Sequence, residues 1–147
     1  MREAVIVEAC RTPISRGKPI VGELSGLHVT KLLSVTFDEL VRRTGIDYAD
    51  VDLVAGGCVT QAGEQSNNIV RHSWLSMGRN YDTGGYTVDA QCGSAQACNH
   101  QLAALVGSGS VDVGICHYYY LMISELIDVE IISYAAAESR YHVLDLV

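Results

Sequence analysis

Short apolar runs separated by longer segments of helical periodicity dominate the chain. Each run has the length of a strand, and its continuous hydrophobic character is typical of strands buried on both faces of a sheet. Strands that alternate with helices predict an α/β fold, here a mostly parallel mixed sheet of four or five strands flanked by helices. The predicted strands are residues 4–9, 51–59, 86–90 and 111–116.

The first predicted helix places Leu33, Phe37 and Leu40 on one face, at the spacing that an amphipathic helix requires. Ser25 is predicted to cap its N-terminus, because a hydroxyl can accept a hydrogen bond from the first free amides. Gly45 is predicted to end the helix, because glycine adopts the left-handed conformation of a C-terminal cap at no steric cost.

Two further helices fill the intervals between the later strands. Asn67 or Asn68 is predicted to cap the second helix and Gly78 to end it, while Gly107 is predicted to close the third. The predicted buried faces are Val70, Trp74 and Met77 in the second helix, and Ala95, Cys98, Leu102 and Leu105 in the third.

Composition excludes several classes of partner. The chain has 147 residues, the size of one domain, and its 17 acidic and 10 basic residues give a net charge of −7. An acidic chain without a basic run is a poor match for nucleic acid or an anionic membrane, and no apolar run is long enough to span a bilayer. The five cysteines show no C-x-x-C pairing, which favours reduced thiols and a cytoplasmic location.

The segment from Val88 to Gln96 carries the candidate chemistry. A predicted strand ends there, Cys92 lies at the corner, and a predicted helix follows at once. Free amides at a helix N-terminus stabilise a thiolate and can hold a developing oxyanion, and Gly93 allows another molecule to approach closely. A helix terminus contributes only about 0.3–1 kcal/mol, so an efficient cysteine nucleophile also needs a nearby base.

The sequence does not identify that base. His100 is eight residues beyond Cys92 on the same predicted helix, about 12 Å along its axis, which is beyond hydrogen-bond reach. The positions of the other histidines cannot be predicted. Cysteine is also a common small core residue, so a purely structural Cys92 stays open from residue type alone. Metal binding by Cys92, Cys98 and His100 is not predicted, because their spacing fits no zinc pattern.

Five blocks of sequence resemble one family in its order along the chain. The resemblance is to the thiolases, specifically the N-terminal half of acetyl-CoA acetyltransferases and 3-ketoacyl-CoA thiolases, and covers about residues 3–116. It is closest to bacterial members that act on lipid or sterol side-chain acyl-CoAs. The predicted organisation is a thiolase-like α/β unit at 1–117 and a divergent tail of unassigned structure at 118–147. The matching blocks are Val5–Ile14, Gly56–Val59, Gly63–Arg71, Val88–Gln96 and Gly109–Ile115.

The resemblance implies a mechanism and its partners. Cys92 would attack the keto carbon of a 3-ketoacyl-CoA, release acetyl-CoA and hold the acyl group as a thioester until a second CoA collects it. The Cys92 N–H would form half of an oxyanion hole. The implied partners are acyl-CoA and CoA as substrates, with no separate cofactor and no metal, and the implied assembly is a homodimer or homotetramer.

The chain departs from the family pattern in two places. Tyr118–Tyr120 stand where the family has a glycine-rich loop, and the Gly-His-Pro histidine that activates the nucleophile is absent from these residues. We therefore expect little or no thiolase activity from this chain alone. Two alternatives stay open: a 3-ketoacyl synthase-like condensing enzyme, which the Gln91-Cys92-Gly93-Ser94 context fits less well, and a non-catalytic half unit that pairs with itself or with a complete thiolase.

Overall fold

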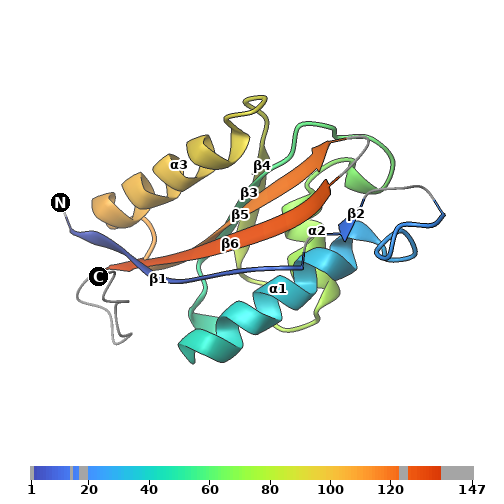
Figure 1. The fold of residues 1–147 in the computed structure, drawn as a ribbon. Coiled ribbons are helices and arrows are strands. Elements are labelled where there is room, and N and C mark those ends of the chain that lie inside the picture. Colours follow the sequence, from blue (N-terminus) through green and yellow to red (C-terminus); the bar gives the residue numbers. More distant parts are fainter. Residues whose placement is uncertain (1, 14, 17–19, 123–125, 137–147) are drawn as a thin grey trace.

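All four predicted strands and all three predicted helices are present in the computed structural model, which describes residues 2–13, 15–16, 20–122 and 126–136 (Figure 1). Their ends differ from the prediction by a few residues. The strands are β1 (Ala4–Arg11), β2 (Ser15–Arg16), β3 (Leu53–Gly57), β4 (Gly84–Val88), β5 (Val113–Met122) and β6 (Leu126–Ala136); the helices are α1 (Val29–Thr44), α2 (Ile69–Ser76) and α3 (Ser94–Ser108).

One sheet in the order β1-β6-β5-β3-β4 forms the centre of the fold, and the short β2 pairs with β6. β3 is parallel to both β4 and β5, because each connection between these strands returns through a helix. β6 runs antiparallel to β5 and to β1. The α/β class is therefore confirmed. The described sheet has six strands instead of the four or five predicted, and its three antiparallel pairs all involve β6. β1 lies at an end of the path and is mostly half-buried, so the predicted burial on both faces is wrong for this strand.

The later part of β5 and all of β6 lie in the segment whose structure the sequence left unassigned. β5 continues through Tyr118–Tyr120 to Met122 as a regular strand, so the family's glycine-rich loop has no counterpart at this place. The predicted boundary after residue 117 falls inside this strand, and the division into a unit and a tail stays a prediction. Residues 137–147 of that tail lie outside the described residues.

Two helix ends differ from the prediction. His28, not Ser25, caps α1, because its imidazole accepts a hydrogen bond from the Thr30 N–H. α3 continues through Gly107 and ends at Gly109, which adopts the left-handed conformation with φ +81°. Gly45 ends α1 in the same conformation, and Asn68 caps α2, both as predicted.

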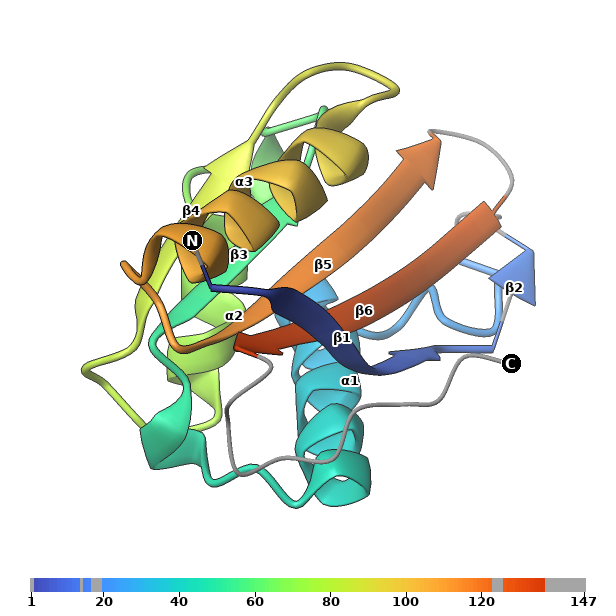
Figure 2. The same cartoon turned by 90° about the vertical axis from the view of Figure 1, so that its left-hand side faces the viewer.

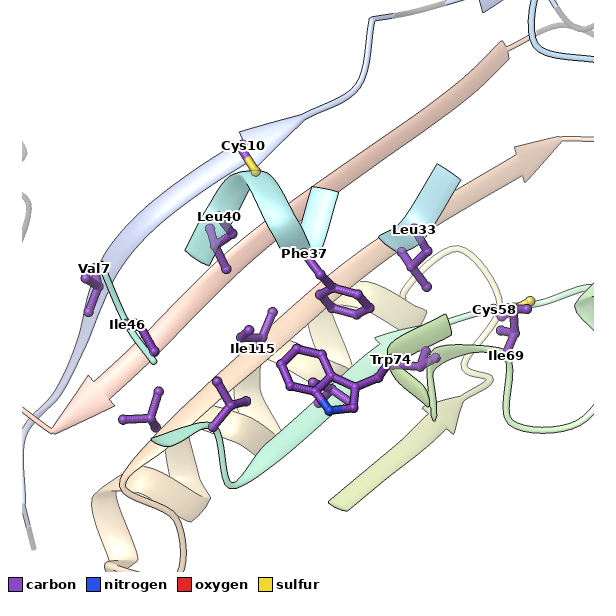
Figure 3. Close-up of a cluster of buried hydrophobic side chains, with 14 of the residues drawn as sticks. Val7, Cys10, Leu33, Phe37, Leu40, Ile46, Cys58, Ile69, Trp74 and Ile115 are labelled. Carbon is purple, nitrogen blue, oxygen red and sulfur yellow. The ribbon is translucent and has the colours of Figure 1, made fainter. Parts of the chain in front are cut away.

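The helices cover the two faces of the sheet unequally. α1 and α2 pack together on one face, while α3 lies alone on the other (Figures 1 and 2). Large buried side chains fill the face under α1 and α2, where the rings of Phe37 and Trp74 meet edge to face with centroids 5.3 Å apart (Figure 3). The core under α3 is built from smaller residues, namely Ala55, Cys98, Leu102, Val106, Val111 and Cys116.

Candidate active site

Cys92 lies in the connection between β4 and α3, two residues before the helix begins, and it is exposed. The turn that presents it is tight: the Gly93 N–H donates to the Ala90 carbonyl at 3.1 Å. Gln91, immediately before Cys92, has a φ of +52°, a left-handed conformation that costs free energy for a residue with a Cβ. The predicted position of Cys92 at a strand-to-helix corner is thus what the structure shows.

The first turn of α3 rests directly on the carboxyl end of β3. A Cβ added at Gly57 would lie 2.7 Å from the Ala95 nitrogen and 2.8 Å from the Ser94 Cβ, so only glycine permits this contact. Gly114 of β5 makes a similar contact: a Cβ added there would lie 2.4 Å from the Leu102 Cδ1 of α3. Sequence reasoning did not identify Gly57, although a glycine at the end of a predicted strand is the signal of such close packing.

Cys92 is the exposed thiol among four buried ones. Cys10 and Cys58 lie in the core beneath α1 and α2, where burial raises the pKa of each thiol. The hydrogen bond to Cys98, followed by burial, raises the pKa of the Cys116 thiol. Thiols of this kind are inert toward aqueous electrophiles, so exposure separates Cys92 from the other cysteines.

Comparison with known proteins decides the family. Residues 4–122 match the N-terminal domain of thiolases. This chain belongs to the thiolase family. It is 41% identical over 113 residues to the steroid 3-ketoacyl-CoA thiolase FadA6 of Mycobacterium tuberculosis, and the match covers 77% of this chain and 27% of that protein. A 3-ketoacyl-CoA thiolase of Colwellia psychrerythraea is 36% identical over 118 residues, which cover 77% of this chain and 29% of that protein.

The fold comparison agrees with this assignment. The thiolase chain matches the crystal structure of the Bacillus anthracis acetyl-CoA acetyltransferase with a TM-score of 0.73 and 27% sequence identity. The match covers 84% of this chain and 30% of that one. The chain therefore spans less than a third of the length of these thiolases.

The histidines of the thiolase chain do not supply a base at Cys92. In the described residues no hydrogen bond or ion pair joins Cys92 to an imidazole. His100 is exposed on α3, His72 is exposed on α2, and His28 caps α1 near Glu64, at 3.9 Å. His142 lies outside the described residues.

His117 is buried on the face of the sheet opposite α3. A Cβ at Gly56 would touch both Val70 of α2 and the His117 ring, whereas the next residue, Gly57, contacts α3. The ring centroids of His117 and Phe37 are 6.4 Å apart. Burial lowers the pKa of His117 to about 3, so the imidazole is neutral at pH 7. The sheet separates it from the corner, and His117 is a core residue.

The block from Asn67 to Arg71 holds β4 in place, in addition to the predicted capping of α2 by Asn68. Asn68 accepts from the Arg71 N–H and from the Thr87 hydroxyl at 3.0 Å, and its amide donates to the Gly85 carbonyl at 2.8 Å. The Arg71 guanidinium donates to the Thr83 carbonyl. These bonds hold β4, and hence the strand that leads to Cys92, against α2.

Other possible sites lie away from the corner. A cavity of about 520 Å³ opens at the end of β1, lined by Ala9, Cys10, Arg11, Thr12, Pro13 and Arg43. Across the described ranges, no cluster of three or more histidine, cysteine or acidic side chains is arranged to bind a metal ion. None of the described helices is long and apolar enough to cross a bilayer.

Proposed function

We propose that this chain is the nucleophile-bearing half of an acyl-CoA thiolase and that Cys92 forms the acyl thioester. One observation carries the proposal: of the five cysteines, Cys92 alone is exposed, and it lies at the end of the parallel strands next to the first turn of α3. Ligands of open α/β sheets bind at this edge. Membership of the thiolase family supports acyl-CoA and CoA as the substrates.

The chemistry proceeds in two steps. The Cys92 thiolate attacks the keto carbon of a 3-ketoacyl-CoA. The bond between the keto carbon and the carbon next to the CoA thioester then breaks, and protonation of that second carbon releases acetyl-CoA. The acyl group stays on the Cys92 sulfur as a thioester. The sulfur of a second CoA then attacks the thioester carbonyl and regenerates Cys92. Similarity to the protein named as a steroid 3-ketoacyl-CoA thiolase supports a bulky steroid-derived 3-ketoacyl-CoA as the substrate of this chain.

The base that activates Cys92 and the second CoA comes from outside the described residues in this proposal. The family resemblance assigns that role to a histidine of a Gly-His-Pro motif, which does not occur in this sequence. We therefore expect little or no thiolase activity from the chain alone. We further propose a cytoplasmic homodimer or homotetramer, with β4 at the end of the sheet as the strand nearest the dimer contact.

Differential labelling of the thiols tests this assignment. With iodoacetamide at pH 7, Cys92 should react far faster than the four buried cysteines, and Cys92→Ser should remove the fast phase. A thiolysis assay with acetoacetyl-CoA should show no turnover by the chain alone. Uniformly slow labelling would support the non-catalytic half unit instead. Turnover that survives Cys92→Ser would contradict the assignment of the nucleophile.

The synthase-like alternative is the weaker one. The two relatives described above are named as thiolases, and the corner sequence Gln91-Cys92-Gly93-Ser94 fits that family better than the Ala-Cys-Ser pattern of the synthases.

A further inference from the structure

We propose that Ser94 is a positioning residue for Cys92: its hydroxyl binds the Ala90 N–H and the carbonyl of the Gln91–Cys92 peptide group, and so fixes the direction of the Cys92 N–H. The inference rests on the proposed function, because it concerns how the nucleophile is held. Ser94 is the first residue of α3 and is 4% exposed.

Both hydrogen-bonding capacities of the Ser94 hydroxyl point back toward the corner. Its oxygen accepts from the Ala90 N–H at 2.9 Å, and its proton is donated to the Gln91 carbonyl at 2.6 Å. The Ser94 N–H also donates to the Gln91 carbonyl, at 3.1 Å. A hydroxyl has a single proton, so the bond to the Gln91 carbonyl uses the only proton that the Ser94 side chain can donate.

The Gln91 carbonyl belongs to the same peptide group as the Cys92 N–H. A peptide group is planar and trans, so fixing the direction of the carbonyl also fixes the direction of the N–H on its opposite side. Ser94 thereby determines where the Cys92 N–H points. This N–H is the group that the thiolase resemblance assigns to the oxyanion hole.

The corner needs such a clamp because Gln91 is in an unfavourable conformation. A left-handed φ at a residue other than glycine persists only where the surroundings hold it. The Asp89 carboxylate accepts from the Gln91 N–H at 3.0 Å, and Ser94 holds the carbonyl on the other side. Both peptide groups of Gln91 are therefore fixed by side chains.

Ser94 does not act as an ordinary helix cap. A capping serine lies at the N-cap and accepts from an amide of the first helical turn. Here the N-cap is Gly93, which has no side chain to donate or accept, and Ser94 bonds to residues before the helix. The contact of Ser94 with Gly57 anchors the clamp on β3. The two hydrogen bonds of the Ser94 hydroxyl therefore hold the backbone before Cys92 and do not cap the free amides of α3.

Labelling of Cys92 in serine variants tests the proposal. We expect Ser94→Ala to slow iodoacetamide labelling of Cys92 at pH 7 by about threefold or more, because the Gln91–Cys92 peptide group is no longer held in one orientation. Ser94→Thr keeps a hydroxyl and should restore the rate. Ser108→Ala, which removes the hydroxyl bonded to the Leu105 carbonyl at the other end of α3, should leave the rate unchanged.

Two further measurements separate positioning from mere stability. The ¹⁵N–¹H signal of Cys92 should shift in Ser94→Ala and return in Ser94→Thr, while urea unfolding reports stability independently. If Ser94→Ala alone does not fold, the Gln91→Gly background removes the left-handed strain, and Ser94→Ala should still slow labelling there. Unchanged labelling and an unchanged Cys92 signal in a folded Ser94→Ala protein would overturn the proposal. If wild-type Cys92 is labelled slowly but its ¹⁵N–¹H signal still shifts in Ser94→Ala, only the proposed function is rejected and the positioning role of Ser94 stands.

Discussion

The two faces of the sheet are packed in opposite ways. Under α1 and α2, large side chains fill the space, and Trp74 and Phe37 are fully buried. Under α3, glycine and other small residues let the helix approach the strands until backbone meets backbone at Gly57. The first arrangement buries much apolar area and stabilises the fold. The second buries less, and it places the start of α3, and with it Cys92, at a defined point on the sheet edge.

The largest expected effect lies on the α1 and α2 face. Trp74→Ala should lower the free energy of unfolding by about 3–5 kcal/mol, because it leaves a cavity against Phe37 and breaks the 2.8 Å bond from the indole N–H to the Asn80 carbonyl. Urea unfolding measures this. Under conditions where the variant stays folded, the labelling rate of Cys92 should be that of the wild type. A changed rate would show that the two faces are coupled.

On the α3 face, a single added methyl group should change the labelling of Cys92 as well as the stability. Gly57→Ala should cost about 1–3 kcal/mol, because its Cβ would collide with the backbone of Ala95, and it should also change the labelling rate of Cys92. Gly26→Ala is the matched control, since no atom lies within 4 Å of its new Cβ. Equal behaviour of the two variants would contradict the close seating of α3.

A smaller effect concerns acid stability, and it belongs to His117. Burial lowers the pKa of His117 to about 3 in the folded chain, so the unfolded chain binds the proton first as the pH falls. The stability is therefore fully present above pH ~6.5 and is lost as the pH falls toward 3. Between about pH 7.5 and 5.5, wild type should lose about 1.4 kcal/mol more than His117→Asn.

Urea unfolding of the wild type and of His117→Asn across this pH range measures the difference. A His117→Asn protein that loses stability in parallel with the wild type would mean that water reaches His117 in the folded chain.

Local pattern was sufficient for much of the fold. The spacing of Leu33, Phe37 and Leu40 identified α1, and all three are fully buried. Asn68 and Gly45 were found at helix ends because their chemistry is local. Ser25 was predicted as the cap of α1 because a hydroxyl is a common cap, but the imidazole of His28 takes that place. Gly107 was predicted to end α3, but the helix continues to Ser108 and is capped by Gly109.

The contacts that arise between distant segments could not be predicted. β6 alternates apolar Ile127, Val129 and Ile131 with acidic residues, but no glycine or proline marks its ends in the sequence. Its pairing with β1, which joins Ala4 to Ala136, is a contact between distant segments. The position of Cys92 followed from a local strand-to-helix pattern. Its supports did not: Gly57 matters because α3 lies on β3, and the Ser94 hydroxyl matters because the chain folds back on Ala90 and Gln91.

The place of β6 also bears on how the chain is made. β1 is translated before β6, yet in the described sheet the two strands are hydrogen-bonded to each other. The helices and β3 to β5 can assemble during synthesis, whereas β1 has no strand partner until β6 has been made. Pairing between segments so far apart in the sequence is slow. A nascent chain arrested before residue 126 would lack β6, so β1 and β5 would each have an unpaired edge exposed to aggregation or to chaperones.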